Sequence, residues 1–69
     1  MQVVTSMAGT VWKVLVRPGD TVSPGQDVVI LESMKMEIPI AAEAGGTVRA
    51  VRVKEGDFVN AGDVLVELE

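Results

Sequence analysis

This 69-residue chain contains no cysteine and no histidine, and its only aromatic residues are Trp12 and Phe58. A disulfide scaffold, the usual zinc sites and any thiol or imidazole chemistry are therefore excluded. The longest strictly aliphatic run, residues 28–31, is far too short to cross a membrane. No apolar segment typical of a signal peptide follows Met1. We therefore expect a cytoplasmic protein that has no membrane partner.

Positive charge is also scarce, because six Lys and Arg stand against ten Asp and Glu, a net charge of −4. Binding to nucleic acid depends largely on Lys and Arg neutralising phosphates, so no nucleic-acid partner is expected. The length allows a single domain over residues 1–69, and a domain this small without disulfides or metal depends on efficient packing. Valine occurs fourteen times, which predicts β-structure in thin, close-packed layers.

An internal repeat organises the chain. A shift of 37 residues aligns positions 9–32 with 46–69, and 12 of the 24 aligned pairs are identical without a gap. The matches include Gly9-Thr10-Val11 with Gly46-Thr47-Val48, and Gly19-Asp20 with Gly56-Asp57. Two copies are too few for an extended array of repeats. A closed domain with a pseudo-two-fold axis is therefore expected.

Each copy is predicted to form short strands separated by turns. Alternation over 14–17 and 51–54 directs Val14, Val16 and their counterparts Val51 and Val53 inward. Val11 and Val48 are out of phase with this set, which indicates a bulge or a change of face in both copies. Pro-Gly at 18–19 and at 24–25 favours type II turns. Further strands are expected near 2–5, 21–22, 27–33, 36–41, 58–59 and 63–68.

These elements predict an all-β fold, a flattened β-barrel or sandwich of two four-stranded antiparallel sheets related by the internal repeat. Trp12 aligns with Arg49 in the other copy, so a half-covered surface position is expected for it. Met7 and Phe58 are assigned to the core.

The centre of the chain, residues 33–37, belongs to neither copy. Lys35 is the midpoint, with 34 residues on each side, and it is the only basic residue between Arg17 and Arg49. It lies between two predicted strands, where a hairpin turn is expected, yet Met-Lys-Met lacks the Asn or Gly that such turns favour. A turn sequence that departs from these preferences at an exposed tip is typical of a functional site.

Two interpretations of this tip follow from the residues. Lys35 could be an ordinary solvated lysine in a structural or interaction module, with Met34 and Met36 filling the core. Alternatively, Lys35 is a uniquely presented amine that an enzyme modifies. A tight tip cannot bury both neighbours of an outward lysine, so at least one of the two methionines should be exposed.

The stretch Glu32-Ser33-Met34-Lys35-Met36-Glu37 resembles the Met-Lys-Met signature of biotinyl domains in biotin-dependent carboxylases. The resemblance covers nearly the whole chain, including the Gly-Thr-Val strand starts and the Gly-Asp turns. It implies the barrel-sandwich hybrid fold and a biotin attached to Lys35 by biotin protein ligase, which recognises Met34 and Met36. It also implies a carrier without catalytic or metal-binding residues, monomeric in isolation, that shuttles carboxyl groups between biotin carboxylase and carboxyltransferase.

One departure from the biotinyl pattern keeps a second function open. Ala or Val commonly precedes the first methionine, whereas Ser33 stands here. The related lipoyl domains often have Glu-Ser before an Asp-Lys-Ala signature. A lipoyl carrier of a 2-oxo-acid dehydrogenase complex, with lipoate on Lys35, or an acceptor of both biotin and lipoate, is therefore the alternative that the resemblance implies.

Overall fold

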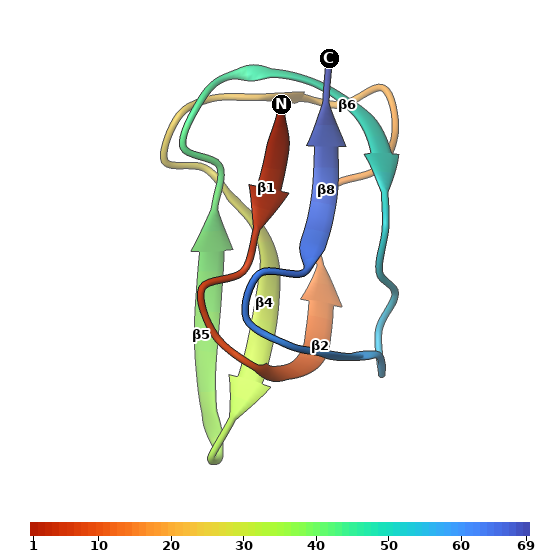
Figure 1. Ribbon diagram of the computed structural model, residues 1–69. Coiled ribbons are helices and arrows are strands. Elements are labelled where there is room, and N and C mark those ends of the chain that lie inside the picture. Colours follow the sequence, from red (N-terminus) through yellow and green to blue (C-terminus); the bar gives the residue numbers. More distant parts are fainter.

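Eight short strands form two sheets in the computed structural model, which describes residues 1–69. The strands are β1 (Gln2–Val4), β2 (Gly9–Val14), β3 (Thr21–Val22), β4 (Asp27–Ser33), β5 (Met36–Ala41), β6 (Gly46–Val51), β7 (Phe58–Val59) and β8 (Val64–Leu68). Their orders are β1-β8-β6-β3 and β5-β4-β2-β7, and every neighbouring pair is antiparallel. The expected class, two four-stranded antiparallel sheets, is confirmed. Figure 1 shows how the longer strands are arranged.

The two halves of the chain interleave, because each sheet takes two strands from each half. The pairing registers also repeat. Gln2 pairs with Glu67 in one sheet, and Pro39, 37 residues after Gln2, pairs with Ile30, 37 residues before Glu67, in the other. The pseudo-two-fold relation therefore reaches β1 and β5, where the sequence identity between the copies has faded.

A bulge lies at the same place in both copies. The register of β2 against β4 shifts between Val11 and Lys13, and that of β6 against β8 shifts between Val48 and Ala50. Of the two alternatives, a bulge or a change of face, the bulge is confirmed. Trp12 and Arg49 lie within these two register shifts and are exposed, as expected for a half-covered Trp12.

The turns between strands repeat as well. Gly19 and Gly56 both have a φ of +96°, at the third position of a four-residue turn. In the first of these turns the Asp20 N–H donates to the Arg17 carbonyl at 3.0 Å, and the Asp20 carboxylate accepts from the Arg17 N–H at 3.0 Å. Asp57 makes the same two bonds with Lys54. The positive φ that type II turns require is thereby confirmed.

The core between the sheets consists of thirteen buried apolar residues, nine of them valine. Val16 belongs to it, and Val14, Val51 and Val53 pack partly buried against it, which agrees with their predicted inward direction. The buried set comprises Val3, Val11, Val16, Val22, Val28, Val29, Leu31, Ala42, Val48, Val59, Leu65, Val66 and Leu68.

Two expectations about this region were wrong. Phe58 is 66% exposed rather than part of the core, because Val59 is the inward residue of the two-residue strand β7. The strands placed at 14–17 and 51–54 instead begin at Gly9 and Gly46 and end at Val14 and Val51. Beyond these ends the chain crosses from one sheet to the other, towards β3 and β7.

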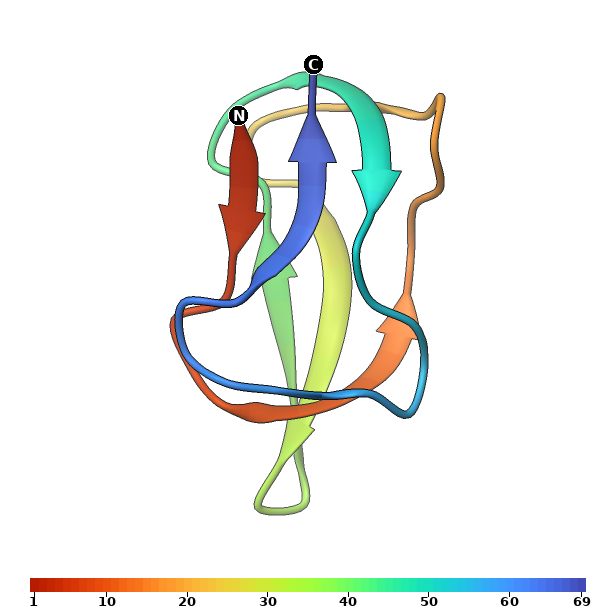
Figure 2. The same cartoon turned by 45° about the vertical axis from the view of Figure 1, so that its right-hand side comes forward.

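The molecule is elongated, with extents of 31 × 19 × 18 Å. The β4–β5 hairpin projects at one end, whereas Met1 and Glu69 lie together at the other (Figure 2). The backbone N–H of Leu68 donates to the Met1 carbonyl at 2.7 Å, so the two ends of the chain are fixed to each other. No helix long and apolar enough to span a membrane is present.

Candidate functional site

The central hairpin has the shortest usual connection. Ser33 pairs with Met36, and the ladder continues through Glu32 with Glu37 and Leu31 with Ile38. Only Met34 and Lys35 therefore form the loop. The base of the hairpin is firmly held, since Leu31 on β4 is completely buried between the sheets. A rigid stem thus carries a two-residue tip.

Both tip residues adopt left-handed backbone conformations, with φ of +52° at Met34 and +64° at Lys35. Positive φ at both central positions is the feature of type I′ hairpin turns, which favour Asn-Gly. A residue with a Cβ pays about 1–2 kcal/mol for this conformation. Strain of this kind is found mainly at functional sites. The unfavourable turn sequence noted above is therefore a real conformational cost at these two residues.

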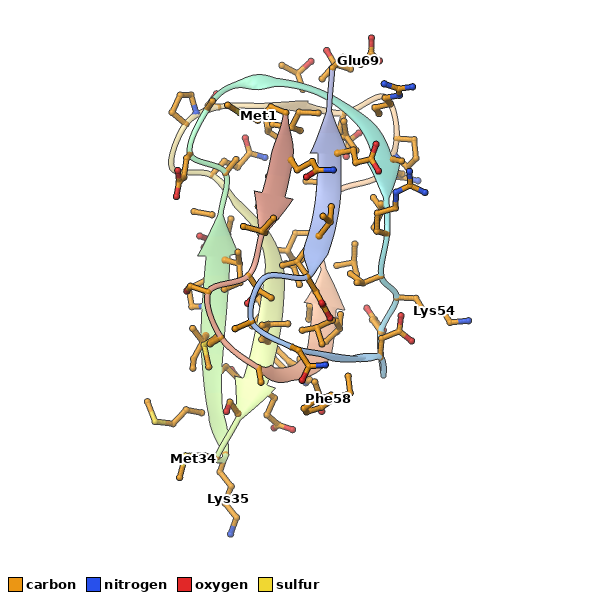
Figure 3. The ribbon with its side chains drawn as sticks, viewed as in Figure 1. Met1, Met34, Lys35, Lys54, Phe58 and Glu69 are labelled. Carbon is orange, nitrogen blue, oxygen red and sulfur yellow. The ribbon has the colours of Figure 1, made fainter.

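The tip side chains are among the most exposed of the molecule. Met34 is 92% exposed and Met36 is 63% exposed, so neither methionine fills the core. The expectation that at least one would be exposed is confirmed. Figure 3 shows Lys35 pointing away from the body of the protein, with its nitrogen at the far end.

Lys35 has no partner that would hold its side chain. The one ion pair of the molecule joins Arg52 and Glu67, and no side-chain hydrogen bond involves Lys35. Its ammonium group is therefore free to move. The side chain can serve as a tether without first breaking a contact with the protein.

Two carboxylates stand directly behind the tip. Glu32 and Glu37 are paired across β4 and β5 and are both exposed. Like charges placed opposite each other cost a few tenths of a kcal/mol, up to about 1 kcal/mol. We call this pair the acidic collar. Any partner that receives Lys35 meets the acidic collar next.

Away from the tip, the surface carries two depressions. There is no group of three Asp or Glu side chains placed to hold a metal ion. The two surface depressions are lined in part by Arg52 and Asp63, and by Val3 and Ala41. Neither depression is lined by Lys35, so the tip is an exposed projection and not a pocket.

A family described as "Biotin-requiring enzyme", the biotin/lipoyl family, matches residues 1–68. The chain belongs to this family. The Biotin/lipoyl attachment protein of Bacillus subtilis (strain 168) is 62% identical over 68 residues, which are 99% of this chain and 93% of that protein. The Biotin carboxyl carrier protein of Streptococcus mutans is 55% identical over 62 residues, 90% of this chain and 48% of that protein.

Solved structures show the same relationship. The Kluyveromyces lactis urea carboxylase matches with a TM-score of 0.93 and 33% identity, covering all of this chain and 6% of that one. The lipoyl domain of the 2-oxoglutarate dehydrogenase complex from Azotobacter vinelandii matches with a TM-score of 0.73 and 32% identity, covering 90% of this chain and 78% of that one. The chain therefore shares its fold with a lipoyl domain and with a part of a urea carboxylase.

The structure also corrects which residues are available at the surface. Phe58 was placed in the core from its apolar character alone. The repeat carried the missing signal, because the counterpart of Phe58 is the polar Thr21, whereas its neighbour Val59 aligns with the buried Val22. An exposed phenylalanine on β7 is thus a surface feature that the sequence interpretation missed.

Proposed function

We propose that this chain is a biotin carboxyl carrier domain that holds biotin in amide linkage to the Nζ atom of Lys35. The observation that carries the proposal is a free amine at the strained tip of a two-residue hairpin, far from the chain ends. The Streptococcus mutans relative is named a biotin carboxyl carrier, and the Bacillus subtilis relative a biotin/lipoyl attachment protein. Both names support the proposal.

Attachment requires one acyl transfer to Lys35. The ammonium group of Lys35 loses a proton to the biotin protein ligase, and its nitrogen attacks the acyl carbon of biotinyl-AMP. A new amide bond forms, the bond to the phosphate breaks, and AMP leaves. Met34 and Met36 flank the amine with exposed, flexible apolar side chains, which suit recognition by a ligase pocket.

In the cycle that we propose, the chain delivers and does not catalyse. Attached biotin would supply a ring nitrogen that takes up a carboxyl group at a biotin carboxylase and releases it at a carboxyltransferase. The β4–β5 hairpin inserts Lys35 into each active site while the sandwich stays outside. Tethering raises the effective concentration of the cofactor at both sites. We place this cycle in the cytoplasm, with the carrier monomeric when alone.

The test is intact mass after co-expression with a biotin protein ligase, and separately with a lipoate ligase. We expect a gain of one biotinyl group in the first case, and no gain in Lys35→Arg. A gain that survives Lys35→Arg, or no gain at all, contradicts the proposal. A lipoyl gain without a biotinyl gain would establish the lipoyl carrier, and no gain with either ligase would favour an interaction module.

The methionines are tested by the double variant Met34→Asp with Met36→Ala. We expect slower biotinylation and a nearly unchanged unfolding midpoint, because both side chains are exposed. Val4→Asp is a matched control, since Val4 is also an exposed apolar residue but lies on β1, away from the tip. A large loss of stability in the double variant would show that the methionines belong to the core. Biotinylation as fast as in the wild type would show that they are not recognition residues.

A further inference from the structure

The outer faces of the two sheets differ although their backbones correspond. Five outward positions related by the 37-residue shift are apolar on the β5-β4-β2-β7 side and polar on the β1-β8-β6-β3 side. The pairs are Trp12 with Arg49, Leu15 with Arg52, Ile30 with Glu67, Pro39 with Gln2, and Phe58 with Thr21. We call the first member of each pair, together, the apolar face.

Folding does not require the apolar face to be apolar. The bulges and registers are the same in both sheets, and the second sheet forms them with polar residues at these positions. Trp12, Leu15 and Phe58 nevertheless leave large apolar surfaces in water. A gathered apolar patch on a small protein typically marks an interaction site.

Strand registers bring the members of the face together. Pro39, Ile30 and Lys13 stand in one row across β5, β4 and β2, with Trp12 in the bulge beside Lys13. The Nζ atom of Lys13 lies 5.5 Å from the centroid of the Trp12 ring, within the range of a cation–π contact. The row nearer the tip contains Glu37, Glu32, Thr10 and Phe58.

Charge is distributed unevenly around this face. The acidic collar, Glu32 and Glu37, borders it on the side of the tip. Lys13 is exposed within the face, in the row of Ile30 and Pro39, which lies farther from the tip than the row of Glu32. A complementary surface would be apolar in the middle, basic where the tip enters and acidic farther out.

We propose that the apolar face docks on the rim of the active site of a biotin carboxylase, a proposal that rests on the proposed function. A biotin carboxylase binds two anions, ATP and bicarbonate, so we expect the entrance to its active site to be basic. This entrance would face the acidic collar. The carboxylase meets the carrier in every turnover, whereas the ligase meets it once. Such docking raises the local concentration of the carrier at the active site.

A second copy of the chain fits this face less well. A stable protein interface buries about 800 Å² per partner, roughly a fifth of the total surface of 4217 Å². The apolar face is a small set of side chains, of which Ile30 is already partly covered. A weak and reversible contact suits a carrier that must leave each active site.

The experiment uses biotinylated carriers, each first shown by mass to hold one biotinyl group. The face variant is Trp12→Gln with Leu15→Gln and Phe58→Thr, and the control variant is Val4→Gln with Thr21→Gln on the other sheet. Neither set changes the net charge. The rate of ATP-dependent carboxylation by the purified biotin carboxylase of the same organism is measured against carrier concentration.

We expect the KM for the face variant to rise at least about tenfold, a loss of about 1.4 kcal/mol of binding, with kcat within about twofold. The control variant should match the wild type, and thermal melts should show all three folded. An unchanged KM would overturn the docking proposal. Slower biotinylation of the face variant with normal carboxylation would also overturn it, because the face would then bind the ligase. A dimer that the wild type forms and the face variant does not form would overturn it as well. Failure of the wild type to accept biotin, seen in the mass before any kinetics, would refute the proposed function itself.

Discussion

The two halves of this chain share a backbone and differ in what they expose. Gly19 and Gly56 have the same φ, and Val29 and Val66 are both completely buried. The halves diverge at outward positions such as Trp12 and Arg49, and at the Lys35 hairpin, which joins them. The comparison teaches that the repeated residues specify the fold, and that the proposed functions lie where the repeat fails.

The largest effects are expected for Val29→Ala and Val66→Ala, which test whether equivalent core positions in the two copies contribute equally to stability. Each substitution removes two methyl groups from a completely buried site, so we expect each to lower the free energy of unfolding by about 2–3 kcal/mol. Urea denaturation of both variants measures the two losses. If one copy lost far less than the other, the equivalence of the two core positions would be wrong.

A smaller and purely backbone effect is expected for Gly19→Ala and Gly56→Ala. Nothing lies within 4 Å of the position that either new Cβ would occupy, so a steric clash is not involved. The positive φ alone should cost about 1–2 kcal/mol in each variant. Equal drops in the unfolding midpoint would confirm that the turns are equivalent, and a neutral effect at either glycine would contradict it.

The tip should respond in the opposite direction. Met34→Asn places a residue favoured in type I′ turns at a position with φ of +52°, and we expect a gain of about 0.5–1 kcal/mol in stability. The same change removes a proposed recognition side chain, so biotinylation should become slower. Thermal melts and timed mass spectra measure both properties. A less stable variant would show that Met34 is not strained, and unchanged biotinylation would show that it is not recognised.

The smallest effect concerns the ion pair that only the second half has. The side-chain hydrogen bond from Arg52, and secondarily its charge, hold the pKa of the Glu67 carboxyl below its ordinary value. Stability from this pair is therefore present above about pH 4.5 and is lost as pH falls through the lowered pKa.

Arg52→Ala should accordingly differ from the wild type in unfolding midpoint at pH 7 and converge with it in acid. Leu15→Ala, at the counterpart position of the first half, should show a difference that does not change over the same range, because Ile30 stands there in place of Glu67. Thermal melts at a series of pH values test both. Parallel curves for Arg52→Ala would contradict the role of the pair.

Much of this architecture could be predicted because the same pattern of residues occurs in two copies along the chain. The two copies predicted most of the strands, the irregularity at Val11 and Val48, and the glycine turns, but misplaced the strands at 14–17 and 51–54. Where only one copy was used, the prediction was wrong: Phe58 was assigned by its apolarity, although alternation with Val59 directs it outward. The crossings between sheets after Val14 and Val51 depend on long-range strand order, which local alternation does not contain.

The site was predictable in position but not in conformation. Lys35 stood out because it lies between the copies in an unsuitable turn sequence. The left-handed φ values of Met34 and Lys35, the acidic collar and the contrast between the two outer faces depend on strand pairing. These features became visible only once the register placed the residues side by side.

The central claim is tested most directly by peptide mass spectrometry of the protein purified from its native cells. The account predicts that the peptide containing Lys35 carries one biotinyl group and that peptides containing Lys13 and Lys54 carry none. Unmodified Lys35 in cells grown with sufficient biotin, or a biotinyl group on another residue, would contradict it.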